Sequence, residues 1–142
     1  HPSLKAASPQ ASPGIEWLGD DYRHYGTFRQ TLALSWTYTN ASARVRPDKP
    51  FDYGTPDRYK FFLELGSLAN INNKYFLGKN AAWNEYIDHP DYDKFWRDKD
   101  VAQYMKNIRF AVLNVIGWFD DQDYYGPWAI YKSIEKNNPD SC

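Results

Sequence analysis

The chain has 142 residues, of which 42% are hydrophobic, so it is long enough to form a packed globular domain. Its 17 basic and 18 acidic residues leave a net charge of −1, which gives no electrostatic attraction for nucleic acid or an anionic membrane. Cys142 is the single cysteine, which excludes an internal disulfide and a cysteine metal cluster. We therefore expect no nucleic acid or membrane partner, no metal site and no cofactor.

The first third of the chain predicts a short strand, a loop and a helix. Residues 4–8 form the strand, which ends before Pro9 because proline cannot continue a β ladder. Phe28, Leu32 and Trp36 recur every four residues, which is typical of a helical face. We expect this helix to run from Thr27 to about position 43 and to bury that face.

Short helices are predicted through the middle of the chain. Asp57, Ser67 and Asp93 are residues that favour helix starts, and Gly66 favours a helix end. Apolar residues recur in the positions that follow each predicted helix start. The pattern predicts helices over residues 57–65, 67–77, 80–87 and 93–96, and one or two further turns over 100–107.

The last part of the chain joins an apolar run to a group of acids. Residues 111–116 are apolar except for Asn114, as in a parallel strand buried on both faces. The run leads into Asp120, Asp121 and Asp123, at the end of the strand where open α/β sheets place their sites. Residues 127–137 then show helical spacing.

This acid-bearing segment resembles a known family. Gly117-Trp118-Phe119-Asp120, with Asp123 close behind, is similar to the acid segment of the serine α/β-hydrolases. That family includes X-Pro dipeptidyl-peptidase, cocaine esterase, glutaryl-7-aminocephalosporanic acid acylase and α-amino acid ester hydrolase. Residues 1–10 are similar to the family's strand after the helix of the nucleophile. The resemblance implies an α/β fold, as a fragment of an α/β-hydrolase with two parallel core strands and a large helical cap insertion.

The resemblance also implies an organisation and an activity. Residues 1–26 would form a core strand and an acidic loop, residues 27–107 the helical cap, and residues 108–142 the second core strand, the turn with the triad acid and the following helix. The parent enzyme would cleave a small acyl ester or amide through an acyl-enzyme, outside the cell or in the periplasm.

Only one member of a Ser-His-Asp triad is expected in this chain. The resemblance implies that Asp120 is the triad acid, which orients the histidine. The sequence lacks a Gly-x-Ser-x-Gly elbow, so the serine is expected before His1 and the histidine after Cys142. His24 and His89 precede Asp120, whereas the family's base follows its acid, so both are interpreted as surface or helix-capping residues. We therefore expect the isolated chain to be inactive.

A second resemblance concerns the substrate. The segment 19–22, Gly-Asp-Asp-Tyr, is similar to a loop of the α-amino acid ester hydrolases, which bind the α-ammonium group of the substrate with three carboxylates. Asp21 and Asp123 match two of these, but Gln122 stands where that subgroup has glutamate, which favours a neutral or differently charged acyl group. An equally open alternative is that all three are ordinary turn residues. The predicted walls of an acyl pocket are the aromatic residues nearest the acids, Trp17, Tyr22, Tyr25 and Trp118.

Two other kinds of function stay open from the sequence. The 6 Trp, 12 Tyr and 8 Phe residues also fit a non-catalytic module that stacks aromatic rings on a sugar or peptide. A structural or interaction domain could instead dock through its strands, because two strands cut from a larger sheet leave edges open to self-association.

Overall fold

The computed structural model describes residues 1–41 and 49–139, in two compact units. Unit 1 is formed by His1–Arg29 and Asp91–Cys142, and unit 2 by Gln30–Pro90. Of the segment predicted as the cap, residues 27–107, unit 2 contains 30–90, and residues 27–29 and 91–107 group with unit 1. The predicted helix end near position 43 and Cys142 lie outside the described residues.

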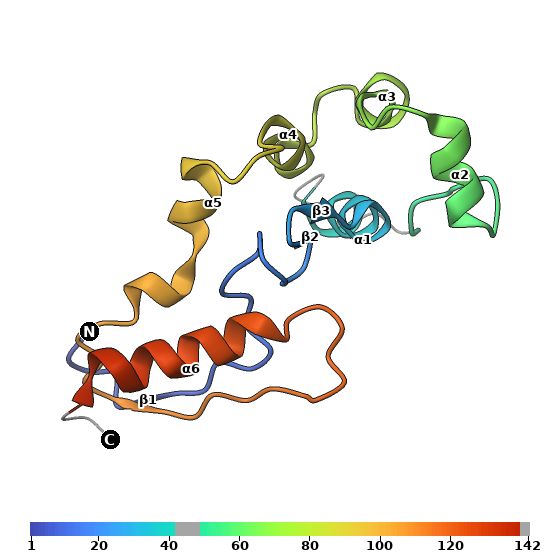
Figure 1. The fold of residues 1–142 in the computed structure, drawn as a ribbon. Coiled ribbons are helices and arrows are strands. Elements are labelled where there is room, and N and C mark those ends of the chain that lie inside the picture. The colour runs from blue at the N-terminus through green and yellow to red at the C-terminus, as the bar shows by residue number, and fades with distance from the viewer. Residues whose placement is uncertain (42–48, 140–142) are drawn as a thin grey trace. The chain divides into compact units, whose positions relative to one another are not determined.

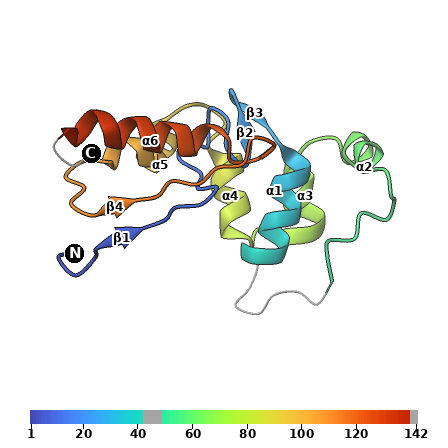
Figure 2. The ribbon, with the colours of Figure 1, turned by 90° about the horizontal axis from the view of Figure 1, so that it is seen from below.

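Unit 1 is built on two parallel strands. Strand β1, Ala6–Ala7, pairs with β4, Ala111–Val112, and the two lie side by side in Figures 1 and 2. An isolated parallel bridge between Gln10 and Val115 extends the pairing toward the acids. The expected α/β pairing of the two chain ends is therefore present.

The strand at 111–116 is shorter and more open than predicted. The ladder proper covers two residues, and Leu113 and Val115 have exposed fractions of 66% and 39%. Val112, Asn114 and Ile116 alternate with them and are half-buried. The expectation of burial on both faces is wrong for this chain, because the described residues cover one face of the strand only.

Helix α6, Tyr125–Asn137, covers that face (Figure 2). Its buried residues include Pro127 and Ile130, and the Asn114 side chain donates to the carbonyl of Pro127 at 2.6 Å. Helix α5, Lys94–Lys99, and the 3₁₀ turn η3, Val101–Tyr104, also belong to unit 1. The hydroxyl of Ser133 on α6 donates to the carbonyl of Ala102 and holds η3 against the helix.

A hairpin replaces the predicted start of the first helix. Strands β2, Arg23–His24, and β3, Thr27–Phe28, pair antiparallel around Tyr25 and Gly26, whose φ angles are both positive. The helix therefore begins later than predicted, because the backbone of residues 27 and 28 is already paired in β3.

Unit 2 contains helical segments. Helix α1, Gln30–Trp36, continues into the π turn η1, Thr37–Ala41. It buries Ala33, Leu34 and Thr37, whereas Trp36 is 43% exposed, so the predicted apolar face is wrong. The remaining elements are α2, Arg58–Leu65, α3, Ala69–Ile71, the π turn η2, Asn72–Phe76, and α4, Ala81–Asp88.

Local capping sets several of these boundaries as predicted. Asp57 accepts from the N–H of Lys60 at the start of α2, and Gly66 ends that helix with a φ of 72°. Asn80 begins α4 by accepting from the N–H of Trp83, which is fully buried. Among the described residues, no helix has the length and apolar character needed to cross a membrane.

Candidate active site

Asp120 lies beyond the end of the paired strand, in a tight turn. Its backbone N–H donates to the carbonyl of Gly117, so the chain reverses directly after the apolar run. Its Oδ1 accepts from the N–H groups of Gln122 and Asp123, each at 2.9 Å. These two bonds lower the pKa of Asp120 and keep the carboxylate ionised. Within the described residues, Oδ2 makes no hydrogen bond and is available to a further donor.

The acidic loop and the Asp120 turn meet through their backbones. Asp20 and Asp123 pair in an isolated antiparallel bridge, and the N–H of Asp21 donates to the carbonyl of Gln122 at 3.0 Å. Asp21 itself has a φ of 42°, in the left-handed region that aspartate tolerates better than most residues. The structure thus brings together Asp21, Gln122 and Asp123, the three positions that the sequence likens to the amino-group site.

The carboxylates of this cluster influence one another. Burial, and then the nearby charges of Asp21 and Asp20, raise the pKa of Asp123 to about 7. Burial and the Asp20 charge also raise the pKa of Asp21, while the Arg29 guanidinium opposes that rise. Asp123 Oδ1 is buried and has no hydrogen-bond partner among the described residues. A positively charged donor would complete this arrangement.

Glu16 is a further acid near the cluster that the sequence analysis missed. Its Oε2 is buried without a hydrogen-bond partner in the described part of the chain. Burial raises the pKa of Glu16, Lys99 opposes the rise, and Asp21 and Asp20 add to it. Glu16 lies in a stretch with no motif, so only the packing of the loop reveals it.

Asp20 joins the acidic loop to helix α6 through buried hydrogen bonds. It is fully buried, and its Oδ2 accepts from the N–H groups of Gly14 and Ile15 at 2.9 and 2.8 Å. Its Oδ1 accepts from the N–H of Gly126, in the first turn of α6, at 2.8 Å. The sequence resemblance points to the neighbouring Asp21 and implies no role for Asp20.

Arg29 connects the two acidic turns on their outer side. Its Nη1 donates to the backbone carbonyls of Asp21 and Asp121 at 3.2 and 2.9 Å. Its Nη2 lies 3.7 Å from Oδ2 of Asp121, whose side chain is 83% exposed. Because Arg29 is engaged mainly with backbone carbonyls, the carboxylates of Asp21 and Asp123 have no direct ion pair within residues 1–41 and 49–139.

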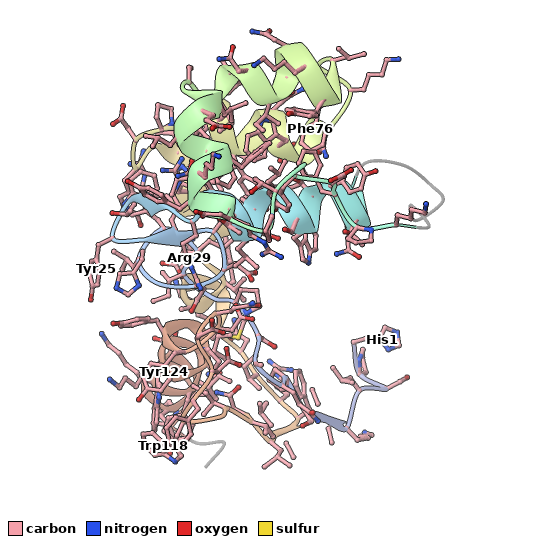
Figure 3. The ribbon with its side chains drawn as sticks, turned by 90° about the vertical axis from the view of Figure 1, so that its right-hand side faces the viewer. His1, Tyr25, Arg29, Phe76, Trp118 and Tyr124 are labelled. Atoms are coloured by element: carbon pink, nitrogen blue, oxygen red, sulfur yellow. The ribbon has the colours of Figure 1, made fainter. Side chains whose placement is uncertain are left out.

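Aromatic side chains form a row beside the acids. Tyr25 lies 6.1 Å from Tyr125 between ring centroids, Tyr125 lies 5.9 Å from Tyr124, and Tyr124 lies 6.4 Å from Trp118. Figure 3 shows Trp118 and Tyr124 close together. Tyr25 and Trp118 are 64% and 75% exposed. Two of the four predicted pocket walls, Tyr25 and Trp118, therefore lie at the surface beside the acidic turns.

The other two predicted walls pack elsewhere. Tyr22 is 2% exposed and belongs to the core. Trp17 contacts the ring of Trp96, with centroids 5.5 Å apart, and the guanidinium of Arg23 lies 4.6 Å from its centroid. Both residues are part of the packing that supports the acidic loop, which is the commoner role of an aromatic residue at such a position.

Within residues 1–41 and 49–139, no group of three or more His, Cys, Asp or Glu side chains is placed to hold a metal ion. The buried, unpaired carboxylate oxygens are hydrogen-bond acceptors that suit a ligand with N–H donors.

Comparisons with known proteins identify the family of this chain. The family model described as X-Pro dipeptidyl-peptidase (S15 family) matches residues 1–140. The crystal structure of an aminopeptidase from the marine sediment archaeon Thaumarchaeota archaeon is similar, with a TM-score of 0.89 and 30% sequence identity. The similarity covers 99% of this chain and 23% of that chain. A comparison with curated proteins finds no match.

Proposed function

Because the chain belongs to the X-Pro dipeptidyl-peptidase (S15) family, we propose that it supplies the triad acid and the helical cap of a serine hydrolase. The whole enzyme would cleave ester or amide acyl bonds through an acyl-enzyme. Asp120 would orient the catalytic histidine and stabilise its charged form. Its Oδ1 is held by two backbone N–H groups, which supports this role because the remaining oxygen is fixed in direction.

The acidic cluster would recognise the free α-amino group of the substrate. The observation that carries this step is the buried Oδ1 of Asp123, which has no donor among the described residues and lies on a turn paired with the acidic loop. An ammonium group supplies three N–H donors and one positive charge. On binding it would satisfy the unpaired oxygen and lower the pKa of Asp123 from about 7.

Glu16 would take the place of the glutamate that Gln122 replaces. Its carboxylate and that of Asp21 each raise the pKa of Asp123, and its buried Oε2 has no donor in the described residues. Loss of a carboxylate at position 122 would then not remove amino-group recognition. This proposal favours α-amino acyl substrates over the neutral acyl groups expected from Gln122 alone.

The test compares two activated acyl esters that differ only in the presence of the α-amino group, with the full-length protein that carries these residues. We expect Asp123→Asn, Asp21→Asn and Glu16→Gln to lower the ratio of kcat/KM for the amino ester to that for the desamino ester. Gln122→Glu should raise it. Asp121→Asn, on the exposed side of the same turn, is the matched control. An unchanged ratio in all four variants would exclude the cluster from substrate recognition.

A further inference from the structure

Asp20 occupies a position that neither the triad nor direct contact with an ammonium group explains. It is fully buried, and both of its carboxylate oxygens accept from backbone N–H groups. The three donors belong to two segments, residues 14–15 and the first turn of α6, which are separated by most of the chain. A carboxylate bound in this way cannot also donate or turn toward a ligand.

The space around Asp20 is built to keep these segments in contact. A methyl group on Gly14 would come within 3.0 Å of both the Cα and the carbonyl oxygen of Gly126, and one on Gly126 would overlap the Asp20 carboxylate. A side chain on Gly19 would overlap the ring of Tyr125. The glycines are thus required by close approach, since none of these three has a positive φ.

The segments that Asp20 joins are those that present the acids. Asp21 follows it directly, Glu16 follows its donor Ile15, and Asp123 is its partner in the antiparallel bridge. We propose that Asp20 is the positioning residue of the amino-group pocket, whose buried carboxylate holds the loop of Glu16, the turn of Asp21 and the start of α6 in one arrangement. This inference rests on the proposed function.

A charge effect accompanies the positioning. The charge of Asp20 contributes to the raised pKa of Glu16, of Asp21 and of Asp123. The other charged groups that act on these acids are Asp120, Arg29 and Lys99. Removing the Asp20 charge should therefore lower the pKa of Asp123, whereas a change that only shifts the backbone should not.

The experiment uses the full-length protein with the two esters described above, over a range of pH. In the unmodified protein the ratio of kcat/KM for the amino ester to that for the desamino ester should rise as pH increases through about 7, because Asp123 ionises there. Taking the ratio cancels the titration of the catalytic histidine, which affects both esters. The kcat/KM of the amino ester is calculated on the concentration of its ammonium form, because the amine titrates in the same pH range. Absence of any preference for the amino ester in the unmodified protein would overturn the proposed function itself.

Asp20→Asn should lower the ratio roughly ten- to a hundredfold, mainly through KM for the amino ester, because an amide cannot accept all three N–H groups. The pH at which this ratio rises should also be lower than in the unmodified protein. Gly14→Ala keeps the charge of Asp20 but places the new Cβ of residue 14 too close to Gly126. It should therefore lower the ratio by a smaller factor and leave unchanged the pH at which the ratio rises.

Asp121→Asn is the matched control and should change neither quantity, because its side chain is exposed. Asp20→Asn could lose activity equally on both esters and leave unchanged the pH at which the ratio rises. That result would show that Asp20 is only structural. It would overturn this inference and leave the proposed function standing. If Asp20→Asn does not fold, Gly14→Ala is the remaining test. An unchanged ratio of the two kcat/KM values in that variant refutes the positioning role.

Discussion

The backbones of Asp20 and Asp123 pair in an antiparallel bridge, although the two residues lie near opposite ends of the chain. The bridge places a turn bearing Asp21 against a turn bearing Asp120 and Asp123, so charges that are remote in the sequence act on one another. Burial first, and then the charges of Asp21 and Asp20, raise the pKa of Asp123 to about 7.

The pH dependence of folding should report this pKa. The pKa of Asp123 rises from 3.8 to about 7, so between these values the folded chain keeps a proton that the unfolded chain has released. The free energy of unfolding should therefore fall as pH rises through this window. We expect Asp123→Asn to remove that part of the fall, measured by urea unfolding at about pH 4 and about pH 8. Asp121→Asn should keep the dependence of the unmodified chain, and an identical pH dependence in Asp123→Asn would contradict the assignment.

Asp120→Asn should impair the chemical step and spare the fold. The new side chain can still accept from the N–H groups of Gln122 and Asp123, but its amide group would face the histidine with a donor where an acceptor is needed. In the full-length protein we expect kcat to fall by roughly 10⁴-fold with little change in KM. A fall of only a few-fold, similar to that of Asp121→Asn, would place the triad acid elsewhere.

Asn80 should be important for the stability of unit 2. Its Oδ1 caps α4 at the N–H of Trp83, and its Nδ2 donates to the carbonyl of Thr37 at 3.0 Å, in a site where Asn80 is 2% exposed. Asn80→Ala should lower the free energy of unfolding by about 2–4 kcal/mol, the sum of a lost N-cap and a lost buried hydrogen bond.

Two variants separate these contributions. Asn80→Ser keeps a neutral N-cap acceptor for the N–H of Trp83 and loses the donor to Thr37, so its loss of stability should come mainly from the buried bond. Asp57→Ala removes the more exposed N-cap of α2 and should cost about 1 kcal/mol. Equal losses for Asn80→Ala and Asp57→Ala in chemical denaturation would show that the bond to Thr37 adds nothing.

The isolated 142-residue chain should self-associate and should not turn over acyl esters. Leu113 and Val115 are exposed, and a largely apolar hollow of about 420 Å³ lies between β1, β4 and α6. Apolar strands with open edges pair with other chains. Light scattering should show oligomers that Leu113→Lys reduces and Leu4→Lys, at another exposed position, reduces less. A monomer at high concentration, or ester turnover that survives Asp120→Ala, would contradict these expectations.

Predictions from the sequence were most accurate where the determining interactions are local. Asp57, Asn80 and Asp93 bond to N–H groups two or three residues further along, so their helix starts could be located from residue types alone. The family resemblance carried by residues 117–120 is confirmed by the family model. Thr27 was misassigned to a helix because its pairing with His24 in a hairpin competes with the helical pattern.

The roles proposed for Asp20 and Glu16 depend on contacts that only the tertiary structure makes. By itself the sequence determined the capped helices, the apolar strand and the position of Asp120 after it, since these depend on residue order over a few positions. Only the folded chain brings the N–H of Gly126 to Asp20 and buries Glu16 near Asp21 and Asp123. Burial and the summed field of distant charges depend on the packing of segments remote in sequence, so residue types and spacing cannot reveal them.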